Sequence, residues 1–151
     1  MKNLKSFKSL ILKYDFFLFD QWGVLHNGHS KFEDAENCLK ILKKNKKKII
    51  LISNSSRPTE DSISNLTKLG FDEHLYDYCI TSGQIAINNI EKDIYAKYGK
   101  TCYPLKLPND KIESFKLKCT KHIKKADFVM IADFDKKYSI LDFAKILDEM
   151  L

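Results

Sequence analysis

The sequence has few cysteines and no long apolar run, and both absences exclude classes of protein. Its four cysteines are far apart and form no CxxC pair, which excludes zinc-ribbon and thioredoxin-like sites. A secreted disulfide framework needs a denser set of cysteines in a shorter chain. The longest apolar runs, such as Ile49 to Ile52, are too short to cross a bilayer. Lysines interrupt residues 1–13, so no signal peptide is expected there. We therefore expect a soluble protein of the reducing cytoplasm, with no membrane partner.

The charge balance does not indicate a nucleic-acid partner. Lysine and arginine outnumber aspartate and glutamate by 26 to 20, which gives a formal net charge of +6. The excess is spread along the chain as lysine, and no nucleic-acid recognition motif accompanies it. Hydrophobic residues make up 44% of the chain, enough for a folded core. The composition is that of a globular protein that does not bind nucleic acid.

Strands and helices are predicted to alternate over the first ninety residues. The apolar run Phe16 to Phe19, which ends at Asp20, and the run Lys48 to Ser53 are typical of strands buried on both faces of a parallel sheet. A helix is expected from Phe32, and another from Thr59 as N-cap to Gly70 as C-cap. A short helix is expected before the first strand. This order predicts βαβ units and a Rossmann-like α/β core.

The second half of the chain is less regular. Tyr78 to Ile80 reads as a third strand and is followed by Thr81-Ser82-Gly83 and a helix. Thr101 to Leu105 and Ala126 to Ala132 are expected to be strands, and Tyr138 to Leu151 a helix. We expect residues 1–100 to form the core and residues 101–151 to form an incomplete α/β cap. The last helical pattern is still running at Leu151, which suggests a fragment.

Polar side chains follow two of the predicted strands. Asp20 ends the first, and Ser53 and Asn54 end the second. Ligands of open α/β sheets bind beyond the carboxyl ends of the strands, and adjacent strands lie about 4.8 Å apart. A carboxylate and a hydroxyl there can act on one phosphate, the first as nucleophile and the second as a ligand of its oxygens. The alternatives are plain: a strand-end aspartate is often a cap or turn residue, and a strand-end serine often caps a loop.

Three stretches together resemble haloacid dehalogenase-like hydrolases. YDFFLFDQWGVLHNG (Tyr14 to Gly28) resembles the family's first motif, and IILISNSSRP (Ile49 to Pro58) its second. CITSGQIA (Cys79 to Ala86) is similar to a segment of the class IIA branch, which includes sugar-phosphate and nucleotide phosphatases. The resemblance implies Mg²⁺-dependent hydrolysis of a small phosphorylated metabolite through an aspartyl-phosphate.

The resemblance also implies roles for individual residues. Asp20 would be the nucleophile and a metal ligand, and the backbone carbonyl of Trp22 a second metal ligand. Ser53 would bind the transferring phosphoryl group. Substrate binding would fall to the loop that follows it, through Asn54, Ser55 and Arg57.

Two departures from the family pattern stand out. In place of the family's usual second aspartate, which acts as general acid and base for the leaving group, this sequence has Trp22, whose indole cannot transfer a proton in this way. The pattern Asp-x-Trp-Gly-Val-Leu-His is typical of one class IIA-like subgroup. The later motifs, a lysine and an acidic pair that completes the magnesium site, are missing, and Asp133 and Asp135 only imitate the pair. The chain alone is therefore expected to be inactive or nearly so. A non-catalytic binding protein of the same fold stays an alternative, and a dehalogenase is a third.

Two further side chains near the first motif have open interpretations. His26 and His29 have an HxxH spacing, but no third metal ligand is near in sequence, so we expect two solvated imidazoles on a flap. Trp22 is expected either to stack on a substrate or to pack under that flap.

Overall fold

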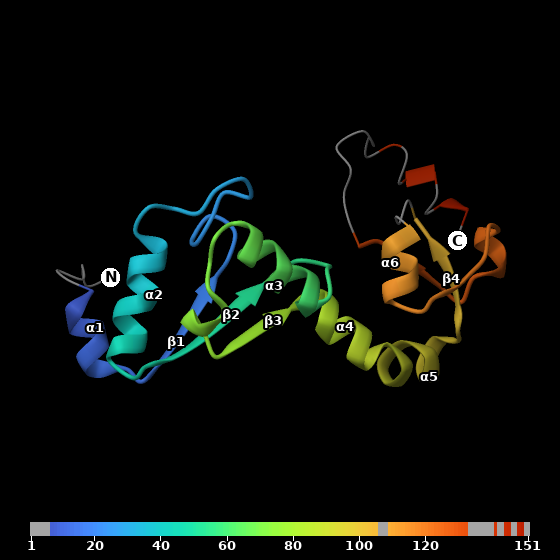
Figure 1. Cartoon of the computed structure of the whole chain (residues 1–151). Coiled ribbons are helices and arrows are strands. Elements are labelled where there is room, and N and C mark those ends of the chain that lie inside the picture. The colour runs from blue at the N-terminus through green and yellow to red at the C-terminus, as the bar shows by residue number, and fades with distance from the viewer. Residues whose placement is uncertain (1–6, 106–108, 133–140, 142–143, 146–147, 150–151) are drawn as a thin grey trace. The chain divides into compact units, whose positions relative to one another are not determined.

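The computed structural model describes residues 7–105, 109–132, 141, 144–145 and 148–149, and it divides into two compact units, Met1–Gln84 and Ile85–Leu151. The first unit holds α1 (Lys8–Lys13), β1 (Phe16–Asp20), α2 (Ala35–Lys44), β2 (Lys48–Ser53), α3 (Thr59–Lys68), the short 3₁₀ helix η1 (Glu73–Leu75) and β3 (Tyr78–Thr81) (Figure 1). Helix α4 (Ser82–Ile90) begins at its end. The predicted alternation of strands and helices is confirmed.

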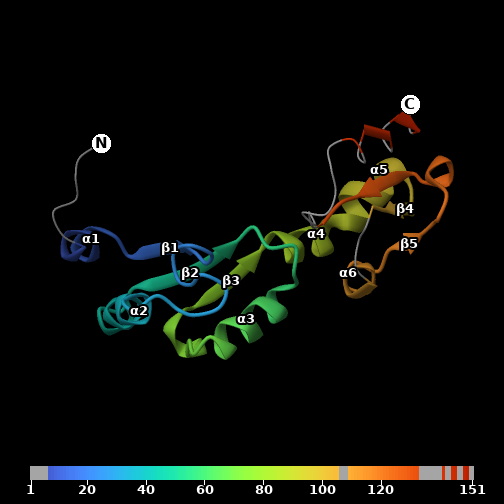
Figure 2. The same ribbon diagram turned by 90° about the horizontal axis from the view of Figure 1, so that it is seen from above.

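The sheet of the first unit is parallel, with β2 between β1 and β3. Asp20 is the register partner of Ile52, and Ser53 that of Thr81. The three strands therefore end at one edge, which we call the carboxyl edge. Helices α2 and α3 make the two crossovers and lie on the same side of the sheet (Figure 2). This is the predicted α/β fold with a Rossmann-like parallel sheet.

Helix α3 shows how local sequence sets the ends of a helix. Thr59 is the first helical residue and Pro58 the N-cap, so the prediction that Thr59 would be the N-cap is wrong by one residue. At the other end Gly70 adopts a φ of +87°. The N–H of Gly70 bonds to the carbonyl of Thr67 at 2.9 Å, and the N–H of Phe71 to that of Leu66 at 3.0 Å. These two bonds form a Schellman motif, which needs the left-handed conformation that glycine adopts easily.

Within the first unit, the described residues cover one face of the sheet. The covered face packs against the helices, and its core includes Leu39, Leu42, Ile49, Leu51 and Leu66, each no more than 1% exposed. The opposite face, which we call the open face, has exposed apolar side chains: Phe16 (66%), Leu18 (61%), Ile52 (38%), Tyr78 (64%) and Ile80 (40%). The prediction that the first two strands are buried on both faces is therefore wrong for this chain. Their continuous apolar runs are those of a doubly covered sheet, but among the described residues of the first unit the helices cover one face of the sheet.

The second unit has its own small parallel sheet. It contains η2 (Glu91–Tyr95), α5 (Ala96–Tyr98), β4 (Thr101–Pro104), α6 (Asn109–Ser114), β5 (Lys118–Cys119), the short helix η3 (Ile123–Lys125) and β6 (Phe128–Met130). Strand β4 lies between β5 and β6. The strands expected at 101–105 and 126–132 are both present. Most of the helix expected at 138–151, and both Asp133 and Asp135, lie outside the described residues.

The division into units does not coincide with the predicted domain boundary. The units meet after Gln84, whereas the sequence suggested residue 100. The assignment of residues 1–100 to the core and of residues 101–151 to a cap stays a prediction. No described helix has the length and apolar character that crossing a membrane requires.

Candidate active site

The two predicted catalytic residues lie at the carboxyl edge of neighbouring strands. Asp20 is the last residue of β1, and Ser53 is the last residue of β2. Because Asp20 pairs with Ile52, Ser53 lies one position further along the adjacent strand. Asp20 is exposed and Ser53 half-buried. A ligand beyond this edge can therefore reach the ends of both strands, which is the arrangement expected from the sequence for Asp20 and Ser53.

The chain turns sharply after Asp20. The carboxylate Oδ1 of Asp20 accepts a hydrogen bond from the N–H of Gln21 at 2.8 Å. The carbonyl of Gln21 accepts the N–H of Leu25 at 2.9 Å, and the N–H of Gly23 donates to the carbonyl of His26 at 2.8 Å. Gly23 has a φ of +80°, a conformation that favours glycine. The turn returns the chain over the strand end and leaves the Asp20 carboxylate exposed.

Trp22 packs within this turn and the flap that follows it. Its ring meets the imidazole of His26 edge-on, with 6.0 Å between ring centroids. A Cβ on Gly28, whose φ is +91°, would lie 2.3 Å from a ring carbon of Trp22. Trp22 nevertheless stays 64% exposed. Of the two interpretations of Trp22, packing against the flap is present, and the exposed part of the ring leaves stacking on a substrate open.

His26 is buried rather than solvated, so that part of the flap prediction is wrong. It is 4% exposed, and its Nδ1 accepts the N–H of Gly28 at 3.0 Å. Burial lowers the pKa of His26, and the negative charge of Asp20 opposes this in part. With Nδ1 as an acceptor, the proton of the neutral ring is on Nε2, and among the described residues that buried atom has no hydrogen-bond partner. His29 is exposed, as expected.

The loop after β2 is ordered by its own serines. The Oγ of Ser53 accepts the N–H of Ser55 at 3.2 Å, and the Oγ of Ser55 accepts the N–H of Arg57 at 3.2 Å. Asn54 and Arg57 are exposed and Ser55 is half-buried. The predicted substrate-binding residues thus share one compact loop next to Asp20.

The Thr81–Gln84 segment holds this loop from the neighbouring strand. The Oγ1 of Thr81 donates to the carbonyl of Arg57 at 2.7 Å, and the N–H of Gly83 donates to the carbonyl of Ser55 at 2.9 Å. A Cβ on Gly83 would lie 2.2 Å from the carbonyl oxygen of Ser56, so the two backbones approach as closely as only glycine allows. The Oε1 of Gln84 accepts the N–H of Thr59 at the start of α3, at 3.2 Å. The sequence singled out this motif but did not show that its role is to support the loop.

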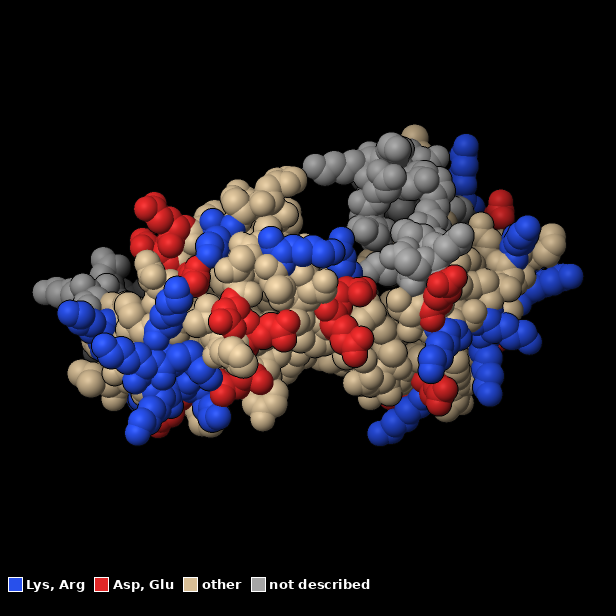
Figure 3. Space-filling model, viewed as in Figure 1, with Lys and Arg blue, Asp and Glu red and all other residues tan. Residues whose placement is uncertain are grey.

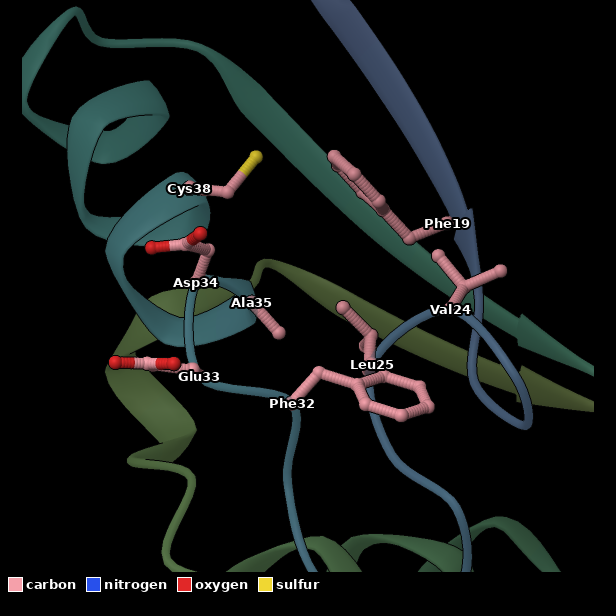
Figure 4. A pocket seen from close by; sticks show the side chains of 8 residues that line it. All are labelled: Phe19, Val24, Leu25, Phe32, Glu33, Asp34, Ala35 and Cys38. Atoms are coloured by element: carbon pink, nitrogen blue, oxygen red, sulfur yellow. The ribbon is translucent and has the colours of Figure 1, made fainter.

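A separate apolar pocket of about 450 Å³ lies between β1 and the start of α2 (Figure 4). The side chains of Phe19, Val24, Leu25 and Phe32 line it, together with Glu33 and Asp34, which precede α2, and Ala35 and Cys38 in the first turn of α2. Asp20 and Ser53 do not line it. Phe19 comes from β1, which has one edge that pairs with no described strand.

The lysine-rich end of α2 lies away from the carboxyl edge. Figure 3 shows Lys and Arg side chains gathered over the end of α2 and the beginning of the strands. Lys43 and Lys48 form ion pairs with Asp77 at 3.2 and 3.0 Å. Lys47 pairs with Asp15 at 2.8 Å. These lysines form ion pairs at the amino end of the sheet, so they are not placed to bind a phosphate beside Asp20.

The strand ends, the turn and the supported loop lie within the part of the chain that matches a known protein family. The sequence pattern of the haloacid dehalogenase-like hydrolases matches residues 17–114. This chain therefore belongs to that family of hydrolases. A search of curated proteins finds no match.

Solved structures with the same fold include phosphatases. A haloacid dehalogenase-like hydrolase of Brucella suis 1330 shares 25% identity with a TM-score of 0.78, over 95% of this chain and 54% of its own. A possible sugar phosphatase of Cytophaga hutchinsonii is 24% identical with a TM-score of 0.61, over 89% of this chain and 44% of its own. A 4-nitrophenylphosphatase of Thermotoga maritima is 22% identical with a TM-score of 0.60, over 91% and 51%. This chain spans about half the length of these relatives.

Proposed function

We propose that this chain is the nucleophile-bearing part of a class IIA phosphatase that hydrolyses a small phosphorylated metabolite in the cytoplasm. The observation that carries the proposal is the placement of Asp20 and Ser53 at the ends of paired parallel strands, beside a loop whose backbone is fixed from β3. The relatives described as a 4-nitrophenylphosphatase and a possible sugar phosphatase support phosphoryl chemistry over dehalogenation. The substrate is thus a phosphate monoester.

The reaction would proceed in two steps on Asp20. Its carboxylate attacks the phosphorus, the bond from phosphorus to the ester oxygen breaks, and an aspartyl-phosphate forms as the leaving group departs as an anion, which takes a proton from water. Water then attacks the aspartyl-phosphate, which releases phosphate and restores the carboxylate. The Ser53 hydroxyl and the N–H groups of the following loop would hold the phosphoryl oxygens. Asn54, Ser55 and Arg57 would bind the rest of the anion.

The residues beside Asp20 fit a hard divalent cation such as Mg²⁺. The Asp20 carboxylate is exposed and accepts one N–H, and the Trp22 carbonyl belongs to the same turn. Oxygen ligands of this kind suit Mg²⁺, which keeps several waters. When bound, the cation would offset repulsion between the carboxylate and the phosphate. The described residues contain no cluster of three or more metal-binding side chains, so Asp20 and Trp22 would form only part of the site.

We propose that further polypeptide completes this site. Three observations support this: the open face of apolar side chains, the edge of β1 that pairs with no described strand, and a match to only 54% of the Brucella hydrolase. A parallel sheet normally has both faces covered. The missing lysine and acidic pair would come with that polypeptide. The chain alone would be inactive or nearly so, and residues 101–151 would begin the cap.

A binding protein of the same fold is the second candidate. It is favoured by one observation, the indole of Trp22 in the position where the family's general acid is expected. Loss of general acid–base catalysis typically slows a reaction by about 10² to 10⁴. A protein in this state could retain the binding of a phosphorylated ligand without useful turnover.

The decisive experiment is a phosphatase assay on the protein together with its completing polypeptide, with and without Mg²⁺, using 4-nitrophenyl phosphate. We expect Mg²⁺-dependent turnover that Asp20→Asn abolishes. Asp15→Asn is the matched control, because Asp15 directly precedes β1, at the opposite end from Asp20, and its side chain is 83% exposed. Turnover that survives in Asp20→Asn would exclude the nucleophile. Phosphate-analogue binding without turnover in the wild type would favour the binding protein.

A further inference from the structure

Gln21, the residue between Asp20 and Trp22, points the other way from both neighbours. It is 5% exposed, whereas Asp20 and Trp22 are exposed. Successive side chains of a strand point to opposite faces, and the strand alternation continues here: Gln21 faces the covered side with Phe17 and Phe19. A long polar side chain is thereby placed inside the unit, directly after the proposed nucleophile.

The buried amide of Gln21 closes a ring of three hydrogen bonds. Its Nε2 donates to the Sγ of Cys79 at 3.3 Å, and its Oε1 accepts the hydroxyl of Ser62 at 2.9 Å. The thiol of Cys79 in turn lies 4.0 Å from the Ser62 Oγ, to which it donates. Each of the three side chains donates once and accepts once. They come from the end of β1, from α3 and from β3, so the ring joins three elements at one point.

The backbone of Gln21 is held as firmly as its side chain. Its carbonyl accepts the N–H groups of Val24, Leu25 and His26 at 3.3, 2.9 and 3.3 Å. Its own N–H donates to the Asp20 carboxylate. Rotation of this one residue would move the carboxylate before it and the carbonyl after it. Buried hydrogen-bonded groups resist such rotation, because a broken bond leaves a polar atom without water.

We propose that Gln21 is a positioning residue: its ring with Ser62 and Cys79 fixes the directions of the Asp20 carboxylate and the Trp22 carbonyl. The roles of Asp20 and Trp22 as cation ligands rest on the proposed function. The ring needs a side chain with both a donor and an acceptor at position 21, and the amide of glutamine supplies both. Glutamate would lose the donor toward Cys79 and bury a charge.

The first test is hydrogen exchange in Gln21→Met, which keeps the size of the side chain and removes both hydrogen bonds. We expect the Leu25 amide to exchange about tenfold faster, in line with the loss of a buried hydrogen bond, while amides of β2 such as Leu51 keep their rates. The control is Gln84→Met, a change of the other glutamine, which should leave the Leu25 amide unchanged. Unchanged Leu25 exchange in Gln21→Met, or equal acceleration across the whole first unit, would overturn the proposal.

The second test measures Mg²⁺ binding at the proposed ligands Asp20 and Trp22. Trp22 is the only tryptophan, so its fluorescence during a Mg²⁺ titration reports on this turn alone. We expect Gln21→Met to weaken the apparent Mg²⁺ affinity severalfold, Cys79→Ala to do the same, and Cys79→Ser, which keeps an acceptor, to restore most of it. Equal affinity in all variants would refute positioning. If the wild type shows no Mg²⁺ response while Leu25 exchange still rises in Gln21→Met, the metal site of the proposed function fails and the fixing of the turn stands.

Discussion

Replacing Gly83 by alanine tests whether the Thr81–Gln84 segment supports the loop after β2. The added Cβ would lie 2.2 Å from the Ser56 oxygen, 2.4 Å from the Ser56 carbon and 2.5 Å from the Arg57 oxygen, all backbone atoms. Gly83 is not in the left-handed region, so alanine meets no strain of its own. The effect is steric, and no side chain can rotate away to relieve it.

The size of the effect follows from how far the loop must move. Ordinary contact of a Cβ begins at 3.4 Å, so the two backbones must separate by about 1 Å. Overpacking of this kind costs about 1–3 kcal/mol. The separation also stretches the hydrogen bond from the Gly83 N–H to the Ser55 carbonyl, which is 2.9 Å long in the wild type. The loss of this bond costs about 1 kcal/mol of stability. We expect Gly83→Ala to lower the free energy of unfolding of the first unit by about 2–4 kcal/mol.

Urea unfolding followed by Trp22 fluorescence measures this loss, and Gly23→Ala is the control. Gly23 has a φ of +80° with nothing within 4 Å of its added Cβ, so alanine there costs only the left-handed strain, about 1–2 kcal/mol. Phosphate-analogue binding should also weaken in Gly83→Ala. An unfolding midpoint equal to that of the wild type, or above that of Gly23→Ala, would show that the loop does not rest on this contact.

Two further predictions concern the flap and the amino end of the sheet. In Gly28→Ala the new Cβ would lie 2.3 Å from the Trp22 ring, so the ring must swing outward and its fluorescence emission should shift to the red; an unchanged emission spectrum would contradict this packing. Asp77 accepts a backbone N–H of β2, and this bond and two lysines lower its pKa from 3.8 to about 2. Because the folded pKa is the lower one, the stabilisation is complete above pH about 4 and is lost as the pH falls through about 2. Asp77→Asn should therefore lower the free energy of unfolding at pH 7 by about 1.5–3 kcal/mol. The midpoint of urea unfolding should also fall less steeply at acid pH in the variant than in the wild type. An equal fall in both proteins would refute the lowered pKa of Asp77.

The sequence predicted the elements of the first unit because each depends on nearby residues. Apolar runs ending in Asp20 and Ser53 define strands, and Gly70 ends α3 through a local Schellman motif. The exposure of Phe16 and Leu18 could not be predicted in this way. An apolar run shows that a strand suits burial, whereas the layer that covers it is formed by other segments. Only the three-dimensional arrangement shows that the described residues of the first unit leave the open face without such a layer.

The placement of the candidate site residues could be predicted where motifs are contiguous, but contacts between distant residues could not; the roles of these residues stay a prediction. Asp20, Ser53 and the loop 54–57 follow from strand ends. The ring of Gln21, Ser62 and Cys79 joins residues 41 and 58 positions apart, and no local pattern indicates it. His26 was expected in water because no third metal ligand lies near it in sequence, but the flap folds back and the Nδ1 of His26 accepts the N–H of Gly28. Such burial depends on the path of the loop and not on its composition.

If the chain acts as proposed, the turn after β1 also predicts which phosphate esters the completed enzyme would prefer. In the proposed reaction Trp22 occupies the position where the family resemblance places the acid that protonates the leaving oxygen, and its ring packs against His26. His26 is a poor substitute, because burial lowers its pKa and its Nδ1 already accepts a hydrogen bond. The leaving group must then depart as an anion or take its proton from water, so the rate should depend steeply on its own acidity. We expect the completed enzyme to cleave aryl phosphates such as 4-nitrophenyl phosphate at least about 10²-fold faster than alkyl phosphates, as measured by kcat over a series of leaving groups. Trp22→Asp should flatten that series, and equal rates across it in the wild type would mean that another residue supplies the proton.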